Sequence, residues 1–175
     1  MSKNRNHDWS DDVYQALKSR HVQLICTVPD AGLTGILNTC HTDSQMTVVT
    51  LTTEEEGVGI ITGAWLGGMR GILLMQSSGT GNCINALSLP QNCQTPCPML
   101  VTMRGEWGEF NPWQVPMGRN VEPVFSQMGV HCFRATRACD VGELLSGALD
   151  LSYHSATSTA VLVDQRVVGA KDFAK

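Results

Sequence analysis

Continuous runs of Val, Ile and Leu alternate along the chain with segments in which apolar residues recur every three to four positions. Uninterrupted apolar runs are typical of parallel strands that are buried on both faces. They predict strands at residues 22–28, 46–51, 71–76, 99–104, 131–134 and 159–164. The segments with helical spacing predict helices at residues 10–19, 32–41, 54–66, 81–92, 121–128 and 141–154.

This alternation predicts an α/β fold: one parallel sheet of about six strands, with right-handed crossovers and helices on both faces. A chain of 175 residues can bury a single core, so residues 1–175 are expected to form one domain. At the start of the first helix, Ser10 is the expected N-cap. Ligands bind such sheets at the carboxyl ends of the strands, which directs attention to the loops at residues 29–35, 52–56, 77–82 and 105–119.

Composition and charge narrow the classes of function. The net charge is -4 and no basic cluster occurs, which argues against a nucleic-acid partner. The N-terminal residues are polar and no apolar run reaches the roughly 20 residues of a membrane span, so we expect a soluble, cytoplasmic protein. The seven cysteines include no CxxC pair and are expected to be reduced thiols in core gaps rather than metal ligands.

Three consecutive glutamates, Glu54, Glu55 and Glu56, open the predicted third helix. Carboxylates at a helix start stabilise it by about 0.3–1 kcal/mol each, so this acidic turn does not by itself require a function. The glycines that follow, Gly57, Gly59 and Gly63, are more unusual. Each costs roughly 1 kcal/mol relative to alanine in a helix, which predicts that another element packs closely on its backbone.

Two further loops carry unusual residues. The segment QSSGTGN at residues 76–82 follows a strand and opens a helix, an arrangement that can bind phosphate. It lacks the third glycine of a dinucleotide fingerprint, where Ile84 stands, and it follows the third strand rather than the first. The loop at residues 104–119 contains Trp107 and Trp113, for which a subunit contact and ligand stacking both remain open.

Three motifs, in this order, resemble one known family: TTEEEGVGIITGAWLGG, ILLMQSSGTGNCINAL and MRGEWGEFNPWQVPMGR. They are similar to the alpha subunits of sulfopyruvate decarboxylases and, less closely, to phosphonopyruvate decarboxylases, both thiamine-diphosphate-dependent decarboxylases. The resemblance extends from residue 27 to residue 164, and VPDAGLTGIL matches the family's first active-site loop more weakly. It implies that this chain is the family's thiamine-diphosphate pyrimidine-binding domain.

The resemblance also implies roles for particular residues. One glutamate of such a domain donates or accepts a hydrogen bond at N1′ of the aminopyrimidine ring. The position relative to the following glycines, compared with the family motif, identifies this glutamate as Glu55. Glu55 would lie in apolar surroundings, and the glutamates on either side of it would point elsewhere on the helix. Ser78, Gly79 and Asn82 would contact the cofactor.

A missing motif implies a partner. The family's diphosphate-binding domain carries Gly-Asp-Gly with a downstream Asn and holds Mg²⁺, and this sequence contains no Gly-Asp-Gly. By resemblance, a separate beta chain would bind the diphosphate and the magnesium ion, and this chain would supply no metal ligand. The active enzyme would be at least a dimer of heterodimers.

The resemblance points to a small 2-keto acid as substrate, with conversion of 3-sulfopyruvate to sulfoacetaldehyde and carbon dioxide as the first expectation. Candidate ligands for its sulfonate or carboxylate are Asn82, Arg104, Gln114 and Arg119. Asp30 either joins a proton relay or only caps the helix after it. Phosphonopyruvate decarboxylation, carboligation with the same cofactor and a non-catalytic binding domain of the same fold remain as alternatives.

Overall fold

A parallel six-stranded sheet forms the centre of the molecule, with strands in the order β2-β1-β3-β4-β6-β5. The computed structural model describes residues 8–169. The strands are β1 (Val22–Thr27), β2 (Thr47–Thr50), β3 (Arg70–Gln76), β4 (Cys97–Thr102), β5 (His131–Ala135) and β6 (Ser158–Val163). Every residue of β4 and β6 is buried, which explains their continuous apolar sequences. The predicted fold class is confirmed.

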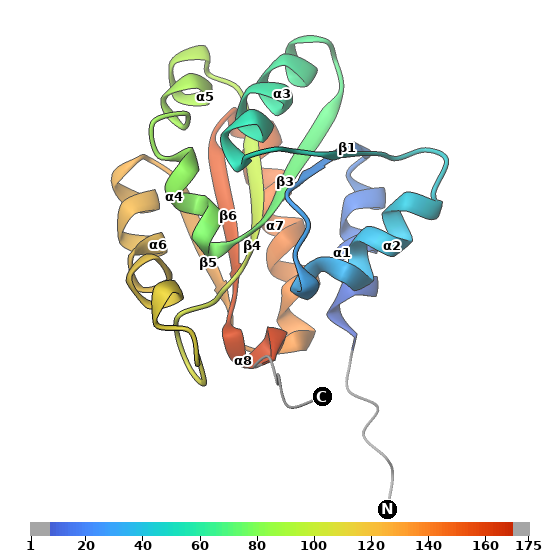
Figure 1. Cartoon of the computed structure of the whole chain (residues 1–175). Helices are drawn as coiled ribbons and strands as arrows, with labels where there is room; N and C mark the ends of the chain where they lie inside the picture. The colour runs from blue at the N-terminus through green and yellow to red at the C-terminus, as the bar shows by residue number, and fades with distance from the viewer. Residues whose placement is uncertain (1–7, 170–175) are drawn as a thin grey trace, which may run out of the picture.

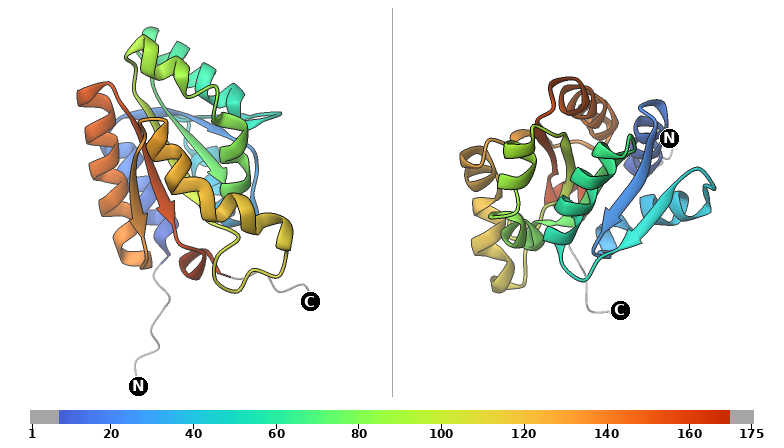
Figure 2. Two further views of the ribbon diagram at one scale, coloured as in Figure 1. Left: turned by 90° about the vertical axis from the view of Figure 1, so that its left-hand side faces the viewer. Right: turned by 90° about the horizontal axis from the view of Figure 1, so that it is seen from above.

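Helices cover both faces of the sheet (Figures 1 and 2). One layer, with its own apolar core, contains α1 (Trp9–Ser19), α2 (Thr34–Thr42) and α7 (Val141–Ser155). The other contains α3 (Glu54–Leu66), α4 (Thr80–Cys83), α5 (Ser88–Cys93) and α6 (Val115–Gln127). A short α8 (Gln165–Val168) follows β6, and single 3₁₀ turns occur at η1 (Ala31–Leu33), η2 (Ser77–Gly79), η3 (Pro112–Gln114) and η4 (Ala138–Asp140).

Three predicted helix boundaries are wrong. Asp8, not Ser10, is the N-cap of α1, because its side chain accepts a hydrogen bond from the Ser10 N–H at 3.0 Å. The helix predicted at residues 81–92 is interrupted between α4 and α5, since Pro90 lacks the N–H that a continuous helix would use. Helix α6 begins at residue 115, earlier than predicted, with proline accommodated in its first turn.

The seven cysteines are free thiols, and four of them, Cys26, Cys40, Cys83 and Cys97, are buried. Burial raises the pKa of the Cys26 thiol to about 11, so this side chain stays neutral and packs as a small apolar group. Within residues 8–169, no helix combines the length and the apolar character needed to cross a membrane.

Candidate active site

Asp30, directly after β1, is held by side chains and backbone from neighbouring strand ends. Its carboxylate accepts hydrogen bonds from the Gly32 N–H at 3.0 Å, from Nε2 of Gln76 at 2.7 Å and from the Thr102 hydroxyl at 3.2 Å. These donors follow β1 or end β3 and β4, which lie side by side in the sheet. Asp30 therefore caps η1 and also joins three strand ends into one polar network.

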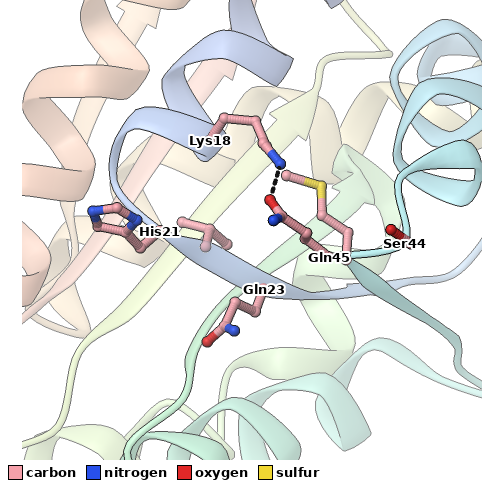
Figure 3. A pocket seen from close by; sticks show the side chains of 7 residues that line it. Lys18, His21, Gln23, Ser44 and Gln45 are labelled. Atoms are coloured by element: carbon pink, nitrogen blue, oxygen red, sulfur yellow. Dashed lines mark hydrogen bonds between the residues drawn. The ribbon is translucent and has the colours of Figure 1, made fainter.

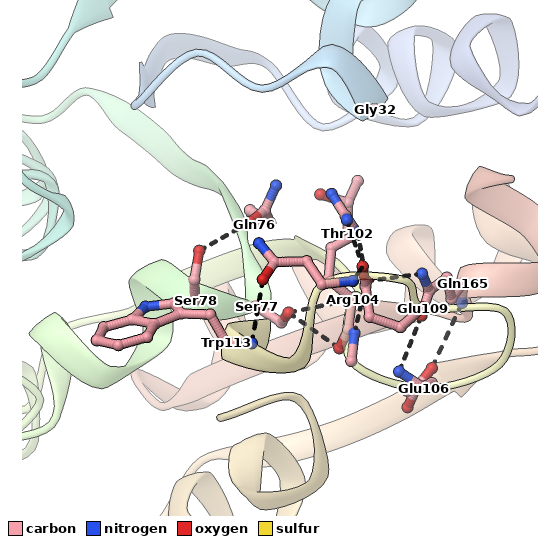
Figure 4. Close-up of polar contacts among 12 residues, drawn as sticks. Gly32, Gln76, Ser77, Ser78, Thr102, Arg104, Glu106, Glu109, Trp113 and Gln165 are labelled. Atoms are coloured by element: carbon pink, nitrogen blue, oxygen red, sulfur yellow. Dashed lines mark hydrogen bonds and ion pairs between the residues drawn. The ribbon is translucent and has the colours of Figure 1, made fainter. Parts of the chain in front are cut away.

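Ser78 belongs to the same network. Its hydroxyl donates to Oε1 of Gln76 at 2.8 Å (Figure 4). Gln76 therefore connects Ser78 to Asp30. Ser78 is exposed, whereas Gln76 is half-buried. Sequence reasoning missed Gln76 as a site residue. The signal was a single long amide at the last position of an otherwise apolar strand, where ligands collect in sheets of this class.

The three glutamates at the start of α3 have different surroundings. Glu54 is buried, at 8% exposure, and its Oε2 accepts a hydrogen bond from Nδ2 of Asn82 at 2.7 Å. Glu55 and Glu56 are exposed, and Glu56 accepts from the Thr52 N–H at 2.9 Å. In the single chain Glu54 faces inward and Glu55 faces outward, because successive helical residues differ by about 100° in direction. The apolar surroundings predicted for Glu55 would have to come from a second chain.

Gly79 is adapted to the Glu54 carboxylate. A Cβ atom on Gly79 would collide with the carboxyl group of Glu54, so any larger residue here would displace that group. The predicted cofactor residues Gly79 and Asn82 therefore meet Glu54, while Ser78 joins the Asp30 network. The structure thus divides the predicted cofactor residues between two neighbouring clusters.

Contacts within the chain explain why a glycine is needed at only one of the three glycine positions inside α3. A Cβ on Gly57 would collide with the side chains of Leu73 and Leu51, as expected for close packing on the sheet. A Cβ on Gly59 or Gly63 would meet no atom within 4 Å. Two of the three helix glycines therefore have an open surface beside them in the described chain.

Arg104, a predicted anion ligand, is paired with Glu109. Its Nε and Nη2 bind the two carboxylate oxygens at 2.7 Å each, and the two side chains are 6% and 1% exposed. Gln165 adds a hydrogen bond to Glu109 at 2.9 Å (Figure 4). The Arg104 guanidinium lowers the pKa of Glu109 to about 2. Two of the three guanidinium nitrogens thus organise the loop after β4 rather than face a ligand.

The other two predicted substrate ligands lie on the segment after that loop. Oε1 of Gln114 is buried without a hydrogen-bond partner in the described structure. A buried acceptor without a donor costs about 1–3 kcal/mol, so a donor from a ligand or another chain is expected there. Arg119 is exposed on α6, and among residues 8–169 no hydrogen bond or ion pair connects it to the other predicted ligands.

Aromatic side chains are exposed around this segment. Trp113 is 83% exposed, Trp107 is 59% exposed and Phe110 is 55% exposed. Trp113 also borders an apolar hollow between α4 and α6, whose lining includes Ile84 and Met117. Exposed apolar patches of this kind mark interaction surfaces.

Replacing Glu109 with Gln should lower the free energy of unfolding by about 3–5 kcal/mol at neutral pH, because Arg104 is left buried without its counter-charge. The folded pKa of about 2 lies below the ordinary 4.5, so this stabilisation is present above pH 4.5 and is lost as the pH falls toward 2. Urea unfolding of both proteins from pH 7 to pH 3 measures the difference. Glu143→Gln, at an exposed position of α7, is the matched control and should cost less than about 1 kcal/mol.

A second hollow, of about 470 Å³, lies at the opposite edge of the sheet, beside the start of β1 (Figure 3). Its lining includes Lys18, whose ammonium group is already bound to Asp43 at 2.7 Å and to Gln45 at 2.6 Å. The candidate site is therefore the carboxyl edge, where the Asp30 network, the Glu54 cluster and the loop after β4 lie.

Comparison with known proteins identifies relatives of matching length. The alpha subunit of sulfopyruvate decarboxylase from Methanococcus maripaludis is 34% identical over 156 residues, which cover 89% of this chain and 93% of the relative. No protein-family model matches the chain.

Two longer relatives match over a shorter stretch. Sulfopyruvate decarboxylase from Methanosarcina acetivorans is 34% identical over 121 residues, covering 69% of this chain but 31% of its own length. Phosphonopyruvate decarboxylase from Streptomyces viridochromogenes is 36% identical over 110 residues, covering 62% of this chain and 28% of its own length.

The fold recurs in a more distant protein. A structure of 2-oxoglutarate:ferredoxin oxidoreductase from Magnetococcus marinus superimposes with a TM-score of 0.67 and 12% identity, over 90% of this chain and 28% of that one. This likeness concerns the fold alone. Taken with the match to alpha subunits over nearly their full length, the comparisons assign a family. The chain belongs to the sulfopyruvate decarboxylase alpha subunit family.

Proposed function

We propose that this chain is the alpha subunit of a two-chain enzyme that converts 3-sulfopyruvate to sulfoacetaldehyde and carbon dioxide with thiamine diphosphate. The match to an alpha subunit over 93% of its length carries the proposal. The longer decarboxylases match over less than a third of their length, 31% and 28%. These coverages support a division of labour. In the longer relatives the rest of the same chain would complete the site, and in the proposed enzyme a second chain would do so.

The Glu54 cluster suits the aminopyrimidine half of that cofactor. When bound, thiamine diphosphate supplies the nucleophilic carbon and the electron sink for the loss of carbon dioxide. This chain's part is to hold a proton at the ring nitrogen, which requires a carboxylate in sheltered surroundings. Glu54 has such surroundings, since it is buried and bound to Asn82, and the missing side chain of Gly79 makes room for its carboxylate.

Two glutamates compete for this role. Register with the glycines of α3 favours Glu55, whose exposed carboxylate would have to be covered by the partner chain. Burial and the contacts with Gly79 and Asn82 favour Glu54. We propose Glu54, with Glu55 as the competing assignment.

The diphosphate and Mg²⁺ are proposed to bind to a beta chain. Mg²⁺ usually needs one or two carboxylates besides phosphate oxygens, and the sequence lacks the family's Gly-Asp-Gly motif. The open surface beside Gly59 and Gly63 and the exposed Trp113 support a face of this chain that packs on another. Two such pairs would form the proposed dimer of heterodimers.

The substrate anion is proposed to bind near Asn82, Gln114 and Arg119. Arg119 is exposed and unpaired with the other predicted ligands, which leaves its guanidinium available for a sulfonate. Arg104 contributes indirectly, by fixing the loop that leads to Gln114.

The test is turnover of the reconstituted pair. The chain and a beta chain carrying Gly-Asp-Gly are mixed with thiamine diphosphate and Mg²⁺, and release of carbon dioxide and aldehyde is measured for 3-sulfopyruvate, 3-phosphonopyruvate and pyruvate. We expect kcat/KM for 3-sulfopyruvate to exceed the others by at least about tenfold. A preference for 3-phosphonopyruvate, or a carboligated product, would establish the corresponding alternative. Absence of turnover with all three acids would contradict the decarboxylase function.

A further inference from the structure

Gln76 occupies a central position in the Asp30 network. It is the last residue of β3, and its amide binds the Ser78 hydroxyl at 2.8 Å (Figure 4). The same amide binds the Asp30 carboxylate at 2.7 Å.

The chemistry of these groups fixes the direction of each hydrogen bond. Oδ2 of Asp30 accepts from the Gly32 N–H and from the Thr102 hydroxyl, and Oδ1 accepts from Nε2 of Gln76. Nε2 of Gln76 donates to Asp30, so the carbonyl oxygen of the same amide faces Ser78. Ser78 must then donate its single proton to Gln76.

We propose that Gln76 is a positioning residue of the decarboxylase site. Its amide donates to Asp30 and accepts the hydrogen bond that the Ser78 hydroxyl donates. The exposed Ser78 oxygen can then only accept a hydrogen bond from a ligand. The group that faces Ser78 is therefore an N–H or O–H donor, not a sulfonate or carboxylate. The inference rests on the proposed function for the identity of the ligand, whereas the directional network rests on the geometry alone.

A charge exchange between positions 30 and 76 tests the network in the chain itself. Gln76→Glu places two carboxylates at the 2.7 Å contact and should lower the urea midpoint of unfolding. In Asp30→Asn/Gln76→Glu, Asn donates to Glu, its oxygen still accepts from Gly32 and Thr102, and Ser78 still donates. The double variant should therefore regain most of the lost midpoint. Gln23→Glu, at an exposed position of β1, adds the same charge and should unfold as the wild type does.

Turnover separates positioning from a purely structural role. In this proposal the Asp30 carboxylate, which Gln76 holds as an acceptor, is a member of a proton relay. In the reconstituted enzyme the double variant, which lacks that carboxylate, should therefore remain at least about 100-fold below the wild type. Gln76→Met, which removes both hydrogen bonds without adding charge, serves if Gln76→Glu fails to fold, and should lower turnover at least about tenfold. Full recovery of turnover by the double variant, or a Gln76→Glu midpoint equal to that of the wild type, would overturn the proposal. If the wild-type pair decarboxylates no keto acid, the proposed function fails, while the unfolding cycle still decides the network.

Discussion

Glu54→Gln should lower kcat of the reconstituted enzyme by about 10²–10⁴-fold while the chain keeps its fold and its partner. Gln is close in shape to Glu and can still accept the hydrogen bond from Asn82, so the Glu54 cluster stays packed. An amide cannot exchange a proton with a ring nitrogen at neutral pH, and loss of such a general acid or base costs about this factor. Steady-state turnover, with urea unfolding to verify the fold, measures the effect.

The neighbouring glutamates are the matched controls for this substitution. Glu55→Gln and Glu56→Gln change the same functional group one and two positions along α3, at exposed sites. Both should retain turnover within about threefold of the wild type, since surface substitutions of this kind change free energies by little. If Glu55→Gln abolishes turnover and Glu54→Gln does not, Glu55 is the catalytic glutamate, as its position relative to the glycines of α3 indicates. The partner chain must then cover Glu55.

The sheet was predictable from the sequence because burial on both faces leaves an uninterrupted apolar run at each central strand. The helices were less so. The first turn of α6 fell within the loop predicted at residues 105–119, although a helix accommodates proline in its first turn. The break between α4 and α5 comes from the missing N–H of Pro90, which the spacing of apolar residues alone does not reveal.

The loops that form the candidate site could be predicted for a topological reason, since the carboxyl ends of parallel strands share one edge. Individual side chains were harder to assign. Three adjacent glutamates provide no periodicity that could distinguish them, and the burial of Glu54 depends on Gly79 in a distant loop. Arg104 looked available because its partner, Glu109, lies in an irregular loop where no helical or strand spacing predicts the pair.

Alone, the chain should bind thiamine diphosphate with a Kd weaker than about 10 μM and should release no carbon dioxide from 3-sulfopyruvate. A Kd of 1 μM corresponds to a binding free energy of about -8.2 kcal/mol. The contacts must supply this free energy in addition to what offsets the entropy lost on association. The proposed contacts of this chain are one carboxylate hydrogen bond, worth about 1.5–3 kcal/mol, and packing of a single ring on a half-open surface.

The diphosphate is the part of the cofactor that demands most from a protein, because its charge needs Mg²⁺ and several oriented donors. Adding the Gly-Asp-Gly chain should therefore tighten binding by at least about 100-fold and start turnover, since both halves of the cofactor are then held. Titration calorimetry with cofactor and Mg²⁺, on each chain and on the mixture, measures these constants, with the Glu54→Gln chain as the control for pyrimidine contacts. Submicromolar binding or turnover by the chain alone would contradict the two-chain enzyme, because one chain would then supply the anchoring that we assign to its partner.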